Sequence, residues 1–213
     1  MLLNLKEAED RKIYITSDPH LGHQRDFVYG ARGFADVKSH DDAVIESFNA
    51  VARPNDILWI LGDLCLNTTV EQFEAYLARI NCQNIYTIWG NHNNPHEKNI
   101  YRKQLDRCGI SPNDEVYPFK YKNLTYWGAY KEVALAGQFA VLFHYPIYVW
   151  NEMSHGAWML CGHSHYGCDF SKADNLNAKI LDVGWDGHLG PWSLEEIKAV
   201  MEKKTIPVVD HHR

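Results

Sequence analysis

The chain has 213 residues, a formal net charge of −6 at pH 7, and 46% hydrophobic and 23% charged residues. This composition is typical of a globular protein, and the length suits one domain with a sizeable core, so we expect a single domain over residues 1–213. The acidic charge argues against an extended nucleic-acid-binding surface. No apolar run approaches the ~20 residues that span a bilayer, and the N-terminus is too short and acidic for a signal peptide, so we expect a cytoplasmic protein without membrane contact.

The first part of the chain alternates strands and helices. Short apolar or β-branched runs predict strands at residues 12–17, 56–61 and 84–89. Apolar side chains at helical spacing predict helices within residues 34–53 and 68–80, and a more polar helix follows over residues 97–107. Such alternation is typical of parallel strands joined by crossover helices.

The second part of the chain changes character. Strands are predicted there without long helices between them, at residues 115–119, 124–127, 138–143, 158–161 and 179–184. Ser193 then caps a closing helix that has Glu195 and Glu196 in its first turn. The five cysteines form no CxxC pair, which argues against a disulfide framework or a zinc ribbon.

Five of the predicted strands end at polar residues. These are Asp18 and His20, Asp63, Asn91 and His92, His144, and His163 and His165. In open α/β sheets, ligands bind at the carboxyl ends of strands. A lone histidine is more often a structural residue, and Asp63 could instead cap a helix, but burying so many imidazoles and carboxylates without partners would be costly. A pair of divalent cations would satisfy them together.

The donor set indicates which cations would fit. The expected metal ligands are Asp18, His20, Asp63, Asn91, His144, His163 and His165. Mixed nitrogen and oxygen donors without a thiolate favour Mn, Fe, Zn or Co over a structural zinc, and the imidazoles argue against purely Mg or Ca sites. Seven ligands are too many for one ion that leaves room for substrate. They suit two ions that share Asp63.

In this order the motifs resemble the calcineurin-like metallophosphoesterase superfamily, over nearly the whole chain. They are Asp18-x-His20, Gly62-Asp63, Gly90-Asn91-His92, His144 and Gly162-His163-x-His165. Residues 18–23, the approach at residues 55–63 and the ending at residues 183–195 look like the small, uncapped bacterial and phage members. The resemblance implies an α/β fold of four αββα layers, in which two mixed β-sheets pack face to face and are flanked by helices.

The resemblance also implies a role for each motif residue. The ligands would divide into Asp18, His20 and His165 for one ion, Asn91, His144 and His163 for the other, and Asp63 between the two. His92 would be catalytic rather than a ligand, and would stabilise the developing charge or protonate the leaving oxygen. Hydrolysis would proceed by attack of a hydroxide that bridges the two ions, with Mn as the expected metal in use.

The chain departs from the Ser/Thr protein phosphatase branch of that superfamily. Asp63 is not followed by the Asp and Arg of that branch, and His92 is followed by Asn93 instead of Glu. A diester carries one fewer charge than a monoester and needs fewer clamping groups, so we expect phosphodiester hydrolysis with small or cyclic nucleotides as substrates. The alternatives are a phosphomonoesterase or nuclease with the same site, or a non-catalytic metal-binding interaction module.

Several further residues are expected to shape the substrate pocket. They are His23, Arg25, Asn91, His92 and His155, together with Arg32 and Trp185. Arg25 and Arg32 could instead pair with Asp26 and Asp36 on the surface. A solvated loop is an equal alternative for His155, and we expect no role for His211 and His212.

Overall fold

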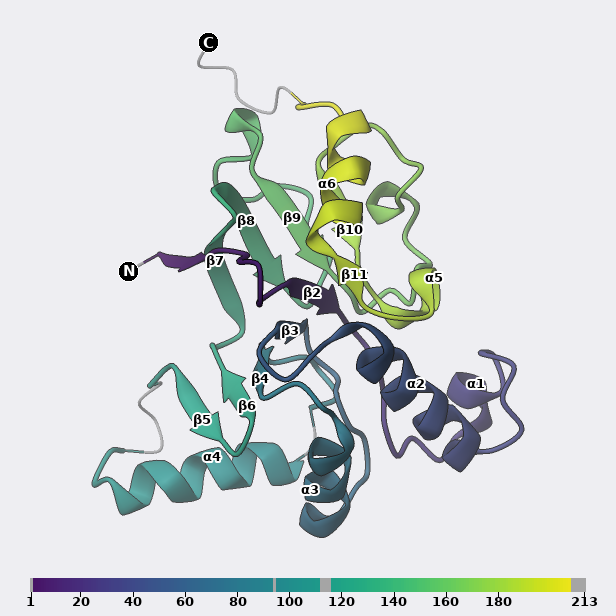
Figure 1. Cartoon of the computed structure of the whole chain (residues 1–213), viewed down its shortest axis with the longest axis vertical. Helices are drawn as coiled ribbons and strands as arrows, with labels where there is room; N and C mark the ends of the chain where they lie inside the picture. Colours follow the sequence, from purple (N-terminus) through teal and green to yellow (C-terminus); the bar gives the residue numbers. More distant parts are fainter. Residues whose placement is uncertain (1, 94, 112–115, 208–213) are drawn as a thin grey trace.

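Two mixed β-sheets form the centre of the computed structural model, which describes residues 2–93, 95–111 and 116–207 (Figure 1). The six-stranded sheet has the order β11 (Trp192–Ser193), β2 (Ile13–Thr16), β3 (Ile57–Ile60), β4 (Asn84–Thr87), β6 (Leu124–Tyr126) and β5 (Phe119–Tyr121). The five-stranded sheet has the order β1 (Leu3–Leu5), β7 (Tyr130–Leu135), β8 (Gln138–Phe143), β9 (Trp158–Cys161) and β10 (Ile180–Asp182). Neighbouring strands are parallel except at the β11–β2, β5–β6 and β7–β8 pairs.

Alternation of side chains along β3 shows how the layers form. Leu58 and Ile60 face a core shared with helices α2 (Val37–Val51), α3 (Val70–Arg79) and α4 (Pro95–Arg107). Ile57 and Trp59 face the other way, into a core shared with β7, β8 and β9. Because successive side chains of a strand point to opposite faces, one short strand serves both cores.

Helices flank the two sheets unequally. Helices α2, α3 and α4 cover the outer face of the six-stranded sheet, and α6 (Leu194–Lys203) packs with its apolar side into the core between the sheets (Figure 1). The outer face of the five-stranded sheet is covered by the loop that contains the 3₁₀ turn η1 (Met153–His155), through Trp150 and Met153. The predicted fold of two mixed sheets with flanking helices is confirmed.

Helix starts follow the sequence signals closely. Asp36, Thr69 and Ser193 each cap a helix, and each forms a capping box with the residue three positions later. The predicted helices thus correspond to α2, α3, α4 and α6. Two further helices are single turns, α1 (Asp26–Tyr29) and α5 (Trp185–His188), and a second 3₁₀ turn, η2 (Asp169–Ser171), follows β9.

The strand predictions need correction at β5 and for three strands that were not predicted, β1, β7 and β11. The strand expected at residues 115–119 is β5, which begins only at Phe119, because Pro118 cannot donate to a strand ladder; residue 115 lies outside the described residues. Strand β7 was not predicted, and it pairs with β8 through a tight turn at Ala136 and Gly137, whose φ angles are 48° and 90°. Ala at the first of these positions hides the usual Asn-Gly hairpin signal.

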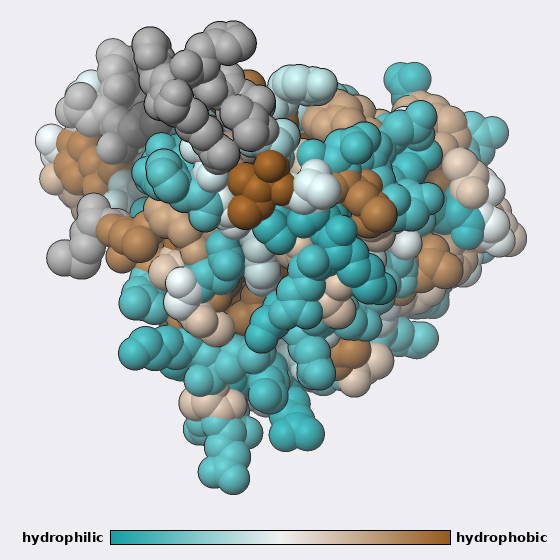
Figure 2. Space-filling view, turned by 90° about the horizontal axis from the view of Figure 1, so that it is seen from above, coloured by the Kyte–Doolittle hydropathy of each residue, from teal (hydrophilic) through white to brown (hydrophobic). Residues whose placement is uncertain are grey.

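The surface carries mostly polar side chains on the face seen in Figure 2, where apolar residues are scattered between hydrophilic ones. Among the helices that the structure describes, none combines the length and apolarity that a bilayer crossing requires.

Candidate metal centre

The predicted ligands meet where strands of both sheets end. Strands β2, β3 and β4 lead to Asp18, His20, Asp63 and Asn91, and strands β8 and β9 lead to His144, His163 and His165. The loops are tied together by their backbones, because Asp18 N donates to Gly62 O at 3.3 Å, and Gly162 N donates to His144 O at 2.9 Å. The structure therefore brings all seven predicted ligands to one place.

The first predicted ligand set forms a compact group. One ligand atom from each of Asp18, His20 and His165 lies within 4.8 Å of the others. His20 Nε2 is 3.7 Å from Asp18 Oδ1, and the rings of His20 and His165 stack with their centroids 5.0 Å apart. These distances leave room for one cation between the three side chains.

The second predicted ligand set is joined through one amide oxygen. Asn91 Oδ1 lies 2.8 Å from His144 Nε2 and 2.9 Å from His163 Nδ1. Asp63 lies between the two sets, since its Oδ2 is 3.4 Å from His144 Nε2 and 3.9 Å from His20 Nε2. This arrangement fits a shared carboxylate, while the division of ligands between two ions stays a prediction.

The polar atoms of the first set test whether a metal fits. Asp18 Oδ1 and both ring nitrogens of His20 are buried without a hydrogen-bond partner. Native proteins rarely leave buried polar atoms unsatisfied, and a bound cation would supply the missing partner. Burial alone would raise the pKa of Asp18, but the neighbouring imidazoles, chiefly that of His20, outweigh this effect and hold that pKa at about 2. Burial lowers the pKa of His20, which favours the neutral imidazole that binds metals.

Backbone strain is concentrated at these ligands. Five of them have φ angles between 49° and 65°, a region that non-glycine residues rarely adopt: Asp18, His20, Asp63, His163 and His165. Such conformations persist only where the surrounding structure fixes them, and they cluster at functional sites. His20 N, for example, donates to Asp63 O at 3.0 Å, and His163 N donates to Asp18 Oδ2 at 2.8 Å.

Two glycines make room for the ligand carboxylates. A Cβ atom at Gly90 would collide with the side chain of Asp63, and one at Gly162 would collide with the side chain of Asp18. Glycine is therefore required at positions 90 and 162, because a ligand carboxylate lies close to each backbone.

Behind His165 lies a supporting ion pair. Asp186 Oδ2 is 2.9 Å from His165 Nδ1, which leaves Nε2 of that ring for a metal. Arg32 donates to both oxygens of Asp186, at 2.8 and 2.6 Å, and to the carbonyl of Asp18 at 2.8 Å. Burial alone would raise the pKa of Asp186, but the hydrogen bonds from His165 and Arg32 hold it well below its usual range.

The roles of Arg32 and Asp186 differ from the predictions. The Arg32 side chain is only 2% exposed and pairs with Asp186, so the surface pairing with Asp36 is wrong. Trp185 is buried beneath the Arg32 guanidinium, 5.2 Å from the ring centroid, and packs in the core. No local pattern links Arg32 to Asp186, because 154 positions separate them.

His92 stands beside the cluster. His92 is exposed. Its backbone N–H donates to Asp63 Oδ1 at 2.8 Å, and its ring centroid lies 5.9 Å from that of His20. The loop that carries His92 is held by Asn93, whose side chain accepts from Gly90 N and donates to Glu97 Oε2 at 3.1 Å. Glu97 thus steadies this loop from within α4, although Glu is absent directly after His92.

The other predicted substrate residues are scattered. His23 is buried against His20, with ring centroids 5.7 Å apart, and Arg25 is exposed at the start of α1. His155 precedes β9, at the opposite end of that strand from His163, and its ring nitrogen lies 2.9 Å from Glu152. The structure does not bring His155 to the cluster. His211 and His212 lie outside the described residues.

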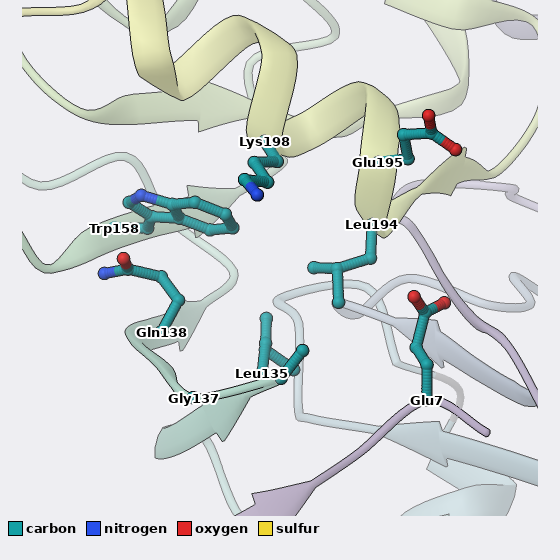
Figure 3. A pocket seen from close by; sticks show the side chains of 9 residues that line it. Glu7, Leu135, Gly137, Gln138, Trp158, Leu194, Glu195 and Lys198 are labelled. Carbon is teal, nitrogen blue, oxygen red and sulfur yellow. The ribbon is translucent and has the colours of Figure 1, made fainter.

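A cavity of about 680 Å³ occupies the opposite end of the strands (Figure 3). It is lined by Gln138 and Trp158, the first residues of β8 and β9, and by Glu7 and Lys198. The predicted ligands follow the last residues of the same strands. This cavity is therefore separate from the metal centre.

Comparison with known proteins agrees with the geometry. Residues 11–167, which include all the predicted ligands, match the family model of calcineurin-like phosphoesterases. The chain is 35% identical over 88 residues to the uncharacterized protein MJ1445 of Methanocaldococcus jannaschii, covering 41% of this chain and 50% of that protein. It is 26% identical over 200 residues to the Gene 66 protein of Mycobacterium phage L5, covering 81% of this chain and 86% of that protein.

A solved structure shares the fold. The protein of unknown function AQ665 from Aquifex aeolicus aligns with a TM-score of 0.62 at 17% sequence identity, over 90% of this chain and 100% of that one. With most of its length matched by the family model, the chain belongs to the calcineurin-like phosphoesterase family. Family membership and the Asp/His clusters support a metal-dependent phosphoesterase with divalent metal ions.

Proposed function

We propose that this chain is a phosphodiesterase with two divalent metal ions, which hydrolyses small or cyclic nucleotides. The observation that carries the proposal is the position of Asp63, whose carboxylate lies within 3.9 Å of His20 and 3.4 Å of His144, one from each ligand set. The unpartnered buried atoms of Asp18 and His20 add to it. We expect Mn as the metal in use, with Fe, Zn or Co as alternatives.

The chain's own residues divide the remaining work. Bound divalent ions would act as Lewis acids toward the phosphoryl oxygens and the attacking water. His92 is exposed beside the ligands, where its imidazole can donate a proton to the leaving oxygen or stabilise its charge. The hydrogen bonds of Asn93 and Glu97 keep the loop of His92 in place.

The preference for diesters rests on the position of Arg32, whose guanidinium donates to the carbonyl of the predicted ligand Asp18. A monoester dianion calls for an additional cationic clamp near the reacting phosphorus. Arg32 could have provided it, but its guanidinium is buried and fully engaged with Asp186 and with the carbonyls of Asp18 and Pro19. Arg32 therefore cannot clamp the scissile phosphoryl group, which favours a diester with one charge at the reacting phosphorus.

Relative turnover of two chromogenic substrates tests the proposal. The Mn-loaded protein is expected to give a higher kcat/KM for bis-p-nitrophenyl phosphate than for p-nitrophenyl phosphate, and chelation should abolish both reactions. A strong preference for the monoester would overturn the diester assignment and favour a phosphomonoesterase. Absence of hydrolysis, with about two metals bound per chain, would favour the non-catalytic module.

A further inference from the structure

A second pocket adjoins the metal centre on the side of α4. It has a volume of about 390 Å³, and Asn91 and His92 form part of its wall. Because these two residues also belong to the predicted ligand and substrate set, the pocket opens directly beside the place where a scissile phosphoryl group would bind. The rest of the wall decides what this pocket can hold.

The part of the wall that α4 forms carries two cations. Lys98 and Arg102 line the pocket, lie four positions apart on α4, and therefore share one face of that helix. Both residues are exposed. No carboxylate lines this pocket, and neither cation pairs with a carboxylate among the described residues, unlike Lys38, Arg79 and Lys122.

Neighbouring groups reinforce the preference for an anion. Asn67 and Asn99 also line the pocket, and their side-chain amides are hydrogen-bond donors. The acidic residue next to Lys98, Glu97, is buried and accepts from Tyr126 at 2.6 Å and from Asn93 at 3.1 Å, within the protein. In a chain with a net charge of −6, these cations form a local positive site.

We propose that Lys98 and Arg102 form a subsite for a second phosphate of the substrate. Guanidinium and ammonium groups bind phosphate through charge-assisted hydrogen bonds, and the guanidinium can do so with two parallel bonds. The preferred substrate is then a phosphodiester that carries another phosphate nearby, such as a 5′-phosphorylated dinucleotide. This inference rests on the proposed function, because it places the scissile diester at the metal ligands.

The test compares two dinucleotides that differ by one phosphate. With the Mn-loaded wild type, kcat/KM for cleavage of the internal diester should be about tenfold to a hundredfold higher for 5′-phosphorylated dithymidine (pTpT) than for dithymidine (TpT). The double variant Lys98→Ala/Arg102→Ala should lose that advantage, mainly through KM, and keep the wild-type rate on TpT. The control Lys103→Ala/Arg107→Ala removes two exposed cations of the same helix that do not line the pocket, and should behave as wild type.

Equal kcat/KM values of the wild type for both dinucleotides would overturn the subsite. An equal fall in kcat/KM for both dinucleotides in the Lys98/Arg102 variant would also overturn it. Release of the 5′-phosphate without internal cleavage would overturn both the subsite and the diester proposal. If no dinucleotide is cleaved, the subsite is tested by equilibrium binding of uncleavable methylphosphonate analogues to the Mn-loaded protein. Tighter binding of the 5′-phosphorylated analogue, lost in the Lys98/Arg102 variant alone, supports the subsite, and equal binding refutes it.

Discussion

Replacing Asp186 by Asn should weaken the metal centre without touching a predicted ligand. The carboxylate of Asp186 meets three donors, His165 Nδ1 at 2.9 Å and two nitrogens of Arg32 at 2.8 and 2.6 Å. An amide has one acceptor oxygen, so at least one of these donors would face an NH₂ group. We expect His165 to lose its fixed orientation and Arg32 its charged partner.

The magnitude follows from the number of bonds affected. A hydrogen bond to a charged group contributes about 1.5–3 kcal/mol, and loss of a group that orients a metal-ligating histidine costs about 10- to 100-fold in metal affinity. Affinity for the ion held by His165 should therefore fall by about 10- to 100-fold. The free energy of unfolding of the metal-free protein should drop by about 2 kcal/mol, because the buried guanidinium of Arg32 loses its negatively charged hydrogen-bond partner.

The assay is a titration of chelator-treated protein with Mn, followed by urea unfolding of the metal-free form. Asp169→Asn is the matched control, because the Asp169 side chain is 88% exposed and pairs only with Lys172 at 2.7 Å among the residues described. That control should bind Mn as the wild type does and unfold within about 0.5 kcal/mol of it. Wild-type affinity in Asp186→Asn would refute the supporting role of the ion pair.

Four other outcomes are expected. Asp63→Ala should lose metal and activity together, measured by metal content and hydrolysis, since its carboxylate faces both ligand sets. His92→Ala should keep its metals and slow hydrolysis by ~10²–10⁴, and unchanged activity would remove His92 from the reaction. Gly162→Ala should lose metal because the methyl group collides with a ligand carboxylate, whereas Gly190→Ala meets only ordinary contacts and should retain it. Added Mn should raise the thermal midpoint of chelator-treated protein, because binding at one hundred times the Kd adds about 2.7 kcal/mol to the free energy of unfolding. An unchanged midpoint would contradict a metal site.

Local signals in the sequence were sufficient for the strands and helices that carry the ligands. β3 is a fully buried apolar run that ends at Gly62, and Thr69 and Ser193 cap helices as expected from their side chains. Short motifs at strand ends also located the seven predicted ligands that converge on the centre. Strand β7 was not predicted, because its first residues include two charged side chains and are not buried. Its turn was not predicted either, because Ala136 stands where a hairpin turn usually has Asn or Gly.

Distant pairings could not be predicted from the sequence. Arg32 and Asp186 each have closer charged neighbours in the chain, and only the fold brings the two together. Likewise, the role of Glu97 depends on α4 turning its first residues back toward the loop of Asn93. Supporting groups of this kind have no fixed spacing from the residues that they orient, so spacing alone cannot reveal them.

The division of ligands between two sheets has a consequence for stability. Asp18, His20, Asp63 and Asn91 follow strands of one sheet, while His144, His163 and His165 follow strands of the other, so any ion held by both groups would fasten the layers to each other. Coupling of this kind is reciprocal. A substitution that loosens the interlayer contacts of Trp59, which is not itself a predicted ligand, should therefore also weaken the binding of such ions.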